Sequence, residues 1–354
     1  MPLTQVVEMV KTVILRVTVL VSIALNLNVL AQETFGIQID QKQWGQGLKT
    51  VRDLIASKRS GNQNPVFNDL YSLDWLDYLY PELIEFQIYA VWLDLTIGAP
   101  FKDPARRLPA VIERLQASTS IERANAFLEE HCFVLGESYF SCGVEPEYIA
   151  GIISIETFFG TYKNVFKFPT LATLASWVAL NNPTFRSYII GTYKHAIDAK
   201  QHFVNNRTDK NFSTAKYDFS QNSIWENRAL SRSKRSISQL RDLLNLAESM
   251  NLNYDSIIKL EGSWVGAITD GQFMPTTLRD ILKAGEIIDP HDLGDVIPLM
   301  ARYLMPYWGE SPEQINKAIG RYNSPKWYRT HVTTVAKLVE ARWKELESEF
   351  NSDE

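Results

Sequence analysis

The sequence has little of several features that define particular protein classes. Its 354 residues include only 17 glycines, and long stretches rich in Leu, Ala, Ile, Glu and Lys favour helices over a sandwich or barrel. It lacks a basic block with interleaved aromatic residues, and its formal charge is −5, so we expect no nucleic-acid partner. The five histidines show no HExxH or paired spacing of metal ligands. We therefore expect no metal and no cofactor.

Cysteine is also scarce, because only Cys132 and Cys142 are present. In an oxidising compartment an even pair at this short spacing could close a small loop, "CFVLGESYFSC". The alternative is two buried free thiols. The spacing favours the disulfide, and neither alternative supplies a nucleophile.

The first 31 residues are predicted to be a signal peptide. Two basic residues precede the apolar run "VTVLVSIALNLNVLA", which ends in the small-residue cleavage pattern Val29-Leu30-Ala31. The run is short and is interrupted by Asn26 and Asn28, so a stable membrane span is not expected. We expect an exported bacterial protein, periplasmic or secreted, cut before Gln32.

The rest of the chain reads as all-α. Residues 32–118 form an amphipathic and strongly apolar region to which no chemistry can be attached, and we treat them as an accessory helical region. A second, larger domain is predicted over 119–354. Within it, residues 205–236 are polar and rich in Ser and Asn, without helical periodicity, and are predicted to form a long loop or insertion.

One glutamate lies on an apolar helical stripe in "GIISIETFFG". The spacing i, i+3, i+4, i+7 and i+10 is shared by Ile149, Ile152, Ile153, Glu156 and Phe159. Pro146 suits the first turn of this helix, and Gly160 suits its end. A buried carboxyl has a raised pKa and can deliver a proton to a leaving oxygen, as glycosidases do. The structural alternative is an ion pair with Arg or Lys, or a helix cap.

Two further stretches could supply polar groups beside such a carboxyl. "GSWVGAITDGQFMPTT", residues 262–277, is an irregular loop with backbone donors and the amide of Gln272. "AIGRYNSPKWY" ends a helix with Tyr322 and Asn323, which can orient a sugar or hydrogen-bond a carboxyl. Asp270 either caps a turn or supplies a second carboxylate.

Together these stretches, in order and spacing, resemble the lytic murein transglycosylase B family (glycoside hydrolase family 103). The resemblance spans about residues 142–330 and implies a lysozyme-like catalytic domain. Matching "GVEPEYIAGIISIETFFG" implies that Glu156 is the sole catalytic carboxyl. The loop and helix-end motifs imply the sugar-binding residues Ser263, Gln272, Tyr322, Asn323 and Tyr328, and a weaker match at "ARYL" adds Tyr303.

The family's chemistry is cleavage of the β-1,4 bond between N-acetylmuramic acid and N-acetylglucosamine in peptidoglycan, with formation of 1,6-anhydromuramic acid ends. One Glu serves as acid and then as base, and peptidoglycan strands are the implied partner. The alternatives are a hydrolytic muramidase that uses Asp270, and a non-catalytic peptidoglycan-binding protein. Some members bind calcium, but Asp289, Asp292 and Asp295 lack the D-x-D-x-D-G pattern, so we expect none.

Overall fold

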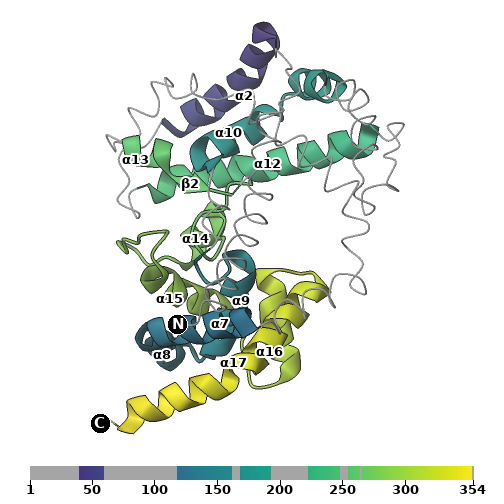
Figure 1. Ribbon diagram of the computed structural model, residues 1–354. Helices are drawn as coiled ribbons and strands as arrows, with labels where there is room; N and C mark the ends of the chain where they lie inside the picture. The colour runs from purple at the N-terminus through teal and green to yellow at the C-terminus, as the bar shows by residue number, and fades with distance from the viewer. Residues whose placement is uncertain are drawn as a thin grey trace, which may run out of the picture.

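The computed structural model describes residues 40–59, 118–161, 168–192, 222–247 and 254–352, except Trp264 (Figure 1). These residues are mainly helical and contain little strand, which confirms the predicted all-α class. The predicted signal peptide, most of the predicted accessory region and residues 205–221 lie outside the described residues. The predicted division between residues 118 and 119 stays a prediction.

The helices form two groups, which lie above and below each other in Figure 1. The upper group consists of α2 (Gln41–Arg59), α10 (Thr170–Ala179), a helix over 183–192, α12 (Asn222–Leu246) and α13 (Tyr254–Lys259). The lower group consists of α7 (Ser118–Glu130), α8 (Cys132–Cys142), α9 (Pro146–Glu156), α15 (Leu293–Leu304), the 3-10 turn η4 (Met305–Tyr307), α16 (Pro312–Tyr322) and α17 (Lys326–Ser352). Helix α14 (Pro275–Ile281) contacts α12 above and α15 below.

Each group is built around one buried helix. All ten residues of α10 are buried, and α2, α12 and α13 pack around it. In the lower group α9 packs against α17, α7, α8 and α15. Helix α2 adds Leu48, Val51 and Ile55 to the core, and it shows that this part of the predicted accessory region is helical, as expected. The described part of the accessory region therefore shares the hydrophobic core of the larger domain.

A two-stranded sheet joins the start of α10 to the loop after α13. Strand β1 (Phe168–Pro169) pairs antiparallel with β2 (Glu261–Gly262), with Phe168 opposite Gly262. The N–H of Thr170 donates to the carbonyl of Leu260 at 2.7 Å. These bonds fix the base of the loop over residues 262–277, which carries Gly271, Gln272 and Phe273 (the GQF motif).

The prediction of a long loop over 205–236 is wrong for residues 222–236, which are helical. Residues 222–236 lie in α12, which begins at Asn222 rather than near residue 237. Ala229, Ser233 and Ser236 lie on its buried face. Small side chains allow the helix to approach α10 closely, and they do not form an apolar stripe that could be seen in the sequence.

The predicted disulfide is also wrong. Cys132 and Cys142 are free and lie at the two ends of α8. A helix rises about 1.5 Å per residue, so its ends are about 15 Å apart. A disulfide requires Cα atoms within about 7 Å of each other. The bridge would require α8 to unfold.

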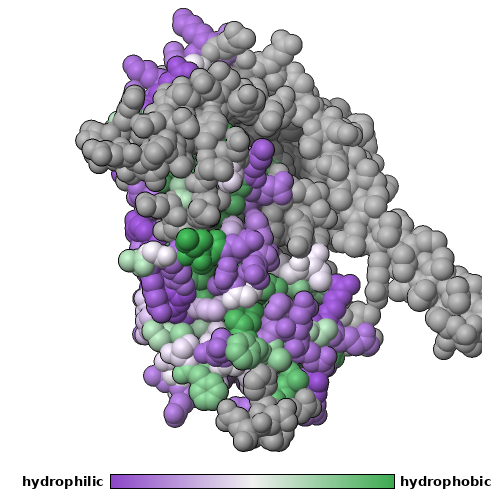
Figure 2. Space-filling view, turned by 90° about the vertical axis from the view of Figure 1, so that its left-hand side faces the viewer, coloured by the Kyte–Doolittle hydropathy of each residue, from purple (hydrophilic) through white to green (hydrophobic). Residues whose placement is uncertain are grey.

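On the face shown in Figure 2, hydrophobic residues of the lower group lie in small areas separated by hydrophilic ones. The most exposed large apolar side chains in the described residues are Phe140, Ile287 and Phe133. No described helix is long and apolar enough to cross a membrane.

Candidate active site

Glu156 is the last residue of α9. The helix begins with Pro146 at its first turn, as the sequence predicts, and Ile149, Ile152 and Ile153 are fully buried on one face. The predicted end at Gly160 is four residues too late, because Thr157 already leaves the helix with φ −134°. The carboxyl therefore stands at the tip of a rigid, buried helix.

The chain turns left-handed directly after this tip. Phe158, Phe159 and Gly160 have φ values of 51°, 59° and 70°. Such a backbone costs a non-glycine residue about 1–2 kcal/mol, so the two phenylalanines store strain beside Glu156. Only Gly160 could signal this turn in the sequence.

The Glu156 carboxyl is held by a tyrosine from another helix. The hydroxyl of Tyr328, at the start of α17, donates to Glu156 Oε1 at 2.7 Å. Burial raises the pKa of Glu156 to about 7, although the Tyr328 hydrogen bond lowers it. The glutamate is half-buried as a whole, so a reactant can reach a carboxyl that is close to half protonated at neutral pH.

A cluster of aromatic rings continues from Tyr328. Tyr322, at the end of α16, stacks on Tyr328 with centroids 6.5 Å apart and an interplanar angle of 13°. Tyr303 meets Tyr322 edge-on at 5.6 Å, and Phe273 contacts both Tyr303 and Tyr322. Burial raises the pKa of Tyr322 and Tyr328 well above the usual range, so both remain neutral hydroxyl donors. The structure thus brings together Glu156, Tyr303, Tyr322 and Tyr328.

The GQF motif reaches this cluster through a tight hairpin. Ile268 and Phe273 pair across it, and the Tyr322 hydroxyl donates to the carbonyl of Gly271. A Cβ at Gly271 would lie 2.9 Å from that hydroxyl, so the contact requires glycine. Gly271 and Phe273 are site residues that sequence reasoning missed, although both lie within the recognised motif.

Gln272 has an unusual position in the hairpin. Its backbone is left-handed, with φ 55°, and its N–H donates to the carbonyl of Thr269 at 2.8 Å. Among the described residues, its Nε2 is buried and has no hydrogen-bond partner. A buried amide without a partner costs about 1–3 kcal/mol, which a ligand oxygen could recover.

Ser263 lies at the base of the loop. Its backbone N–H donates to the carbonyl of Ala267 at 2.8 Å, and its Oγ accepts from the N–H of Ala267 at 3.0 Å. The side chain is 5% exposed. Ser263 therefore shapes the loop, and its role as a sugar ligand stays a prediction.

Asp270 and Asn323 flank the cluster. Asp270 is buried in the hairpin, and its N–H donates to the carbonyl of Pro290 at 3.2 Å. Asn323 follows Tyr322 at the end of α16, and its N–H donates to the carbonyl of Ile319 at 3.0 Å. Whether either side chain contacts a substrate stays a prediction.

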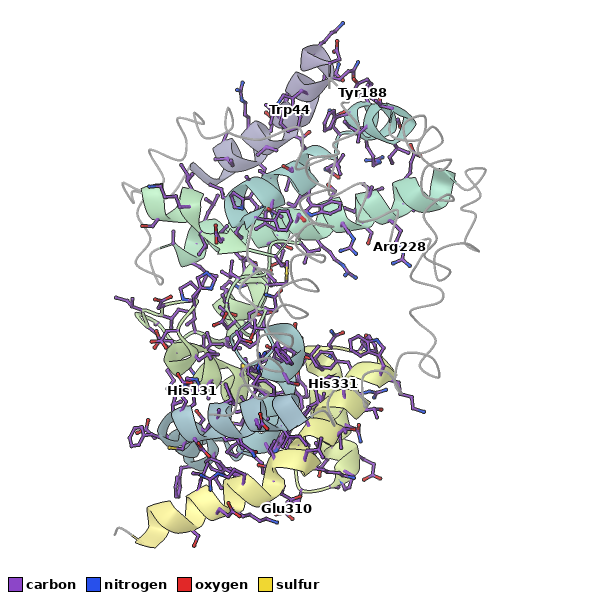
Figure 3. The ribbon with its side chains drawn as sticks, viewed as in Figure 1. Trp44, His131, Tyr188, Arg228, Glu310 and His331 are labelled. Carbon is purple, nitrogen blue, oxygen red and sulfur yellow. The ribbon has the colours of Figure 1, made fainter. Side chains whose placement is uncertain are left out.

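Behind Glu156, α17 makes a second polar contact with α9. His331 (labelled in Figure 3) lies one turn after Tyr328 and contacts the Oγ of Ser154 through Nε2 at 3.1 Å. Ser154 Oγ also donates to the carbonyl of Gly151 at 2.6 Å. Two side chains of α17 thus hold the last turn of α9.

The aspartates near α15 bind backbone N–H groups of their own loop. Asp292 caps α15 by accepting from the N–H of Gly294, Asp295 accepts from the N–H of Asp289, and Asp289 accepts from the N–H of His291. Among the described residues no group of three His, Cys, Asp or Glu side chains could hold a metal ion. These carboxylates shape the loop before α15.

The model of the family described as "Transglycosylase SLT domain" matches residues 103–311, more than half of the chain. The chain belongs to this transglycosylase family. The family resemblance and the enzyme class predicted from the sequence, a lytic transglycosylase, are confirmed. No curated protein matches this transglycosylase.

Solved structures with the same fold include the lytic transglycosylase Slt35 and the protein SltB3. Escherichia coli Slt35 in complex with bulgecin A is 16% identical, with a TM-score of 0.52 over 84% of this chain and 93% of that one. Pseudomonas aeruginosa SltB3 in complex with NAG-anhNAM-pentapeptide is 14% identical, with a TM-score of 0.50 over 82% of this chain and 78% of that one. At these identities the likeness shows the fold alone.

Proposed function

We propose that this transglycosylase cleaves the β-1,4 bond between N-acetylmuramic acid and N-acetylglucosamine in peptidoglycan, and that Glu156 is its only catalytic carboxyl. The observation that carries this proposal is the Glu156 carboxyl itself, with its pKa raised to about 7 and Tyr328 bound to Oε1. SltB3, which shares the fold, binds NAG-anhNAM-pentapeptide, a product of this kind.

In the first step the protonated Glu156 gives its proton to the glycosidic oxygen. The bond from that oxygen to the anomeric carbon breaks, and the N-acetylglucosamine 4-hydroxyl leaves. The substrate's own N-acetyl group stabilises the anomeric carbon in place of a second protein carboxylate.

In the second step the Glu156 carboxylate takes the proton of the muramyl 6-hydroxyl. The oxygen of that hydroxyl bonds to the anomeric carbon and closes the 1,6-anhydro ring. Glu156 is protonated again, and no water is consumed. A pKa near 7 suits both steps, because the same group must donate and accept a proton at neutral pH.

Neutral groups around Glu156 suit this chemistry. Tyr322 and Tyr328 keep their hydroxyl protons, which they donate to the Gly271 carbonyl and to Glu156, and their hydroxyl oxygens can accept from sugar hydroxyls. The buried Nε2 of Gln272 can donate to a substrate oxygen, and that bond would satisfy it. We assign further sugar contacts to Ser263, Tyr303 and Asn323 on the motif resemblance.

The mass of the products tests the mechanism against hydrolysis. We expect muropeptides from purified sacculi to be about 18 Da lighter than those from a hydrolase. A hydrolase adds one water to each cleaved bond, whereas closure of the 1,6-anhydro ring adds none. Asp270→Asn should change the rate little. Reducing-end muramic acid as the main product, together with loss of activity in Asp270→Asn, would assign the enzyme to the muramidases. Folded protein that binds sacculi without releasing products would identify a binding protein.

We also propose that the protein is exported after cleavage of residues 1–31. The support is the apolar run that ends in Val29-Leu30-Ala31. N-terminal sequencing of the protein from an expressing bacterium should give Gln32 as the first residue. An intact Met1 on the cytoplasmic protein would contradict export.

A further inference from the structure

The left-handed turn after Glu156 must be held in place by its surroundings. Two of its three residues, Phe158 and Phe159, are of types that avoid this backbone, so the turn persists only if other contacts impose it. Local bonds contribute, since the N–H groups of Thr157 and Phe159 both donate to the carbonyl of Ile153, at 3.1 and 3.2 Å. Gly160 also donates to Thr157 Oγ1 at 3.1 Å.

Side chains of helix α7 contact both Phe158 and Phe159. The guanidinium carbon of Arg123 lies 4.7 Å from the ring centroid of Phe158, within the range of a cation–π interaction. The ring of Phe127 lies 5.8 Å from that of Phe159. Arg123 and Phe127 are four residues apart, so they lie on the same face of α7. One helix face therefore covers both strained residues.

Helix α7 also contacts α17, the helix whose Tyr328 binds the Glu156 carboxyl. Glu129, near the end of α7, forms an ion pair with Arg342 of α17 at 2.8 Å. Near its start, α17 carries Tyr328, which donates to Glu156. The tip of α9 is thus held twice, through the carboxyl by α17 and through the following turn by α7.

We propose that Arg123 is a positioning residue, whose cation over Phe158 clamps the left-handed turn and so keeps the Glu156 carboxyl desolvated and aligned against Tyr328. The inference rests on the proposed role of Glu156 as the proton donor. Tyr328 of α17 and Tyr322 of α16 are the titratable groups that interact with the Glu156 carboxyl. His331 of α17 contacts Ser154, and Arg123 of α7 lies over Phe158.

The first test compares Arg123→Met with Arg123→Lys. The Met side chain keeps the length and loses the cation, so the turn should relax and admit water to Glu156. We expect kcat on purified sacculi to fall about tenfold at pH 7, with KM within about twofold. The alkaline limb of the kcat profile should move to lower pH, because the pKa of a solvated carboxyl returns toward its ordinary value. Arg123→Lys keeps the cation and should retain most of kcat and the pH limb.

The matched control is Arg232→Met. Arg232 of α12 lies over the ring of Trp177 at 5.8 Å, so this variant loses a similar cation–π contact in the other helix group. It should keep the parental kcat and pH profile. A double-mutant cycle of Arg123→Met with Phe158→Leu should be non-additive, because each change removes the same contact.

A direct readout is the ¹³C NMR titration of the Glu156 carboxyl, assigned by the loss of its signal in Glu156→Gln. Its pKa should be lower in Arg123→Met than in the parent and in Arg123→Lys. Folded Arg123→Met with the parental pKa and pH profile would overturn the clamp, even if kcat fell. If Glu156→Gln kept normal turnover, the proposed function would fail first, and the NMR result would still decide whether Arg123 orders the turn.

Discussion

Two glutamates of α9 show how position decides the behaviour of a carboxyl. Glu156 ends the helix and Glu147 lies in its first turn, yet burial raises the pKa of both to about 7. Glu156 stands out in the sequence because it interrupts an apolar stripe. Glu147 gives no such signal, since residues far along the chain bury it; Glu340 and Lys344 of α17 lie nearby. A raised pKa therefore does not distinguish the two glutamates, whereas the hydrogen bond from Tyr328 does, and it supports the catalytic role proposed for Glu156.

Glu156→Gln should abolish turnover while the protein stays folded. The amide keeps the shape of the side chain but has no proton to transfer, and loss of acid–base catalysis costs about 10²–10⁴-fold in rate. Release of muropeptides from sacculi measures the rate, and circular dichroism checks the fold. Glu147→Gln is the control and should keep normal turnover, because its carboxyl lies at the other end of α9. Equal losses in the two variants would contradict the assignment.

Gln272→Ala should lower kcat/KM about 10–100-fold without lowering the melting temperature. The Nε2 of Gln272 has no partner among the described residues, so its removal should cost the folded protein little and the bound substrate a hydrogen bond. Gln239→Ala is the contrasting variant, because Gln239 Oε1 accepts from the N–H of Thr276 at 2.9 Å. That variant should melt at a lower temperature. A destabilised Gln272→Ala with unchanged kcat/KM would show that the amide serves the fold.

At the scale of elements, large apolar residues predict helices well and small ones predict them poorly. The apolar run around Glu156 predicts helix α9 and its start at Pro146 correctly. The start of α12 was missed because its buried face carries Ala229, Ser233 and Ser236 before large residues return at Leu240. The polar surface of that stretch resembles a loop until its neighbour α10 is known. Likewise, the spacing of Cys132 and Cys142 cannot reveal that a straight helix separates them.

Ser233→Leu tests the close contact between α12 and α10. Ser233 is fully buried, and its Oγ donates to the carbonyl of Val178 at 3.5 Å. A leucine there would overpack the interface and should lower the free energy of unfolding by about 1–3 kcal/mol. Lys234→Leu, one residue further on the exposed face, should change it by less than about 0.5 kcal/mol. Urea denaturation measures both, and similar values for the two would show that the small residue is not required.

At the scale of the whole molecule, the site is assembled from segments far apart in the chain. After α2 in the upper group, the chain runs through the lower group, crosses to the upper group and returns (Figure 1). Tyr328 of α17 thus reaches Glu156 of α9 from 172 residues further along the chain, and Tyr322 of α16 links Tyr328 to the GQF hairpin. The motifs group Glu156, Tyr303, Tyr322 and Tyr328, and the structure brings these four side chains together. The motifs could not predict that Tyr322 binds the carbonyl of Gly271 or that Ser263 bonds within its own loop, because those contacts depend on the packed geometry.

The contribution of Glu147 to the stability of the protein should fall as the pH rises from about 4.5 to 7. Burial raises the folded-state pKa of Glu147 from 4.5 to about 7, so the folded state holds a proton that the unfolded state has released. The proton then favours folding at low pH, and this contribution disappears as the pH passes through the folded pKa. Removing the charge with Glu147→Gln should therefore raise stability relative to the parent by about 2 kcal/mol more at pH 7.5 than at pH 5.

Glu286→Gln is the comparison, because the pKa of Glu286 is lowered in the folded state, whereas that of Glu147 is raised. Arg302 lowers the pKa of Glu286 through a hydrogen-bonded ion pair, so its contribution is present above the unfolded value and is lost only as the pH falls below it. The stability difference between this variant and the parent should stay constant between pH 5 and 7.5. Urea denaturation at the two pH values, with circular dichroism as the signal, gives both comparisons. If Glu147→Gln also showed a constant difference, its carboxyl would be ionised in the folded state, and Glu156 would be the only carboxyl of α9 with a raised pKa.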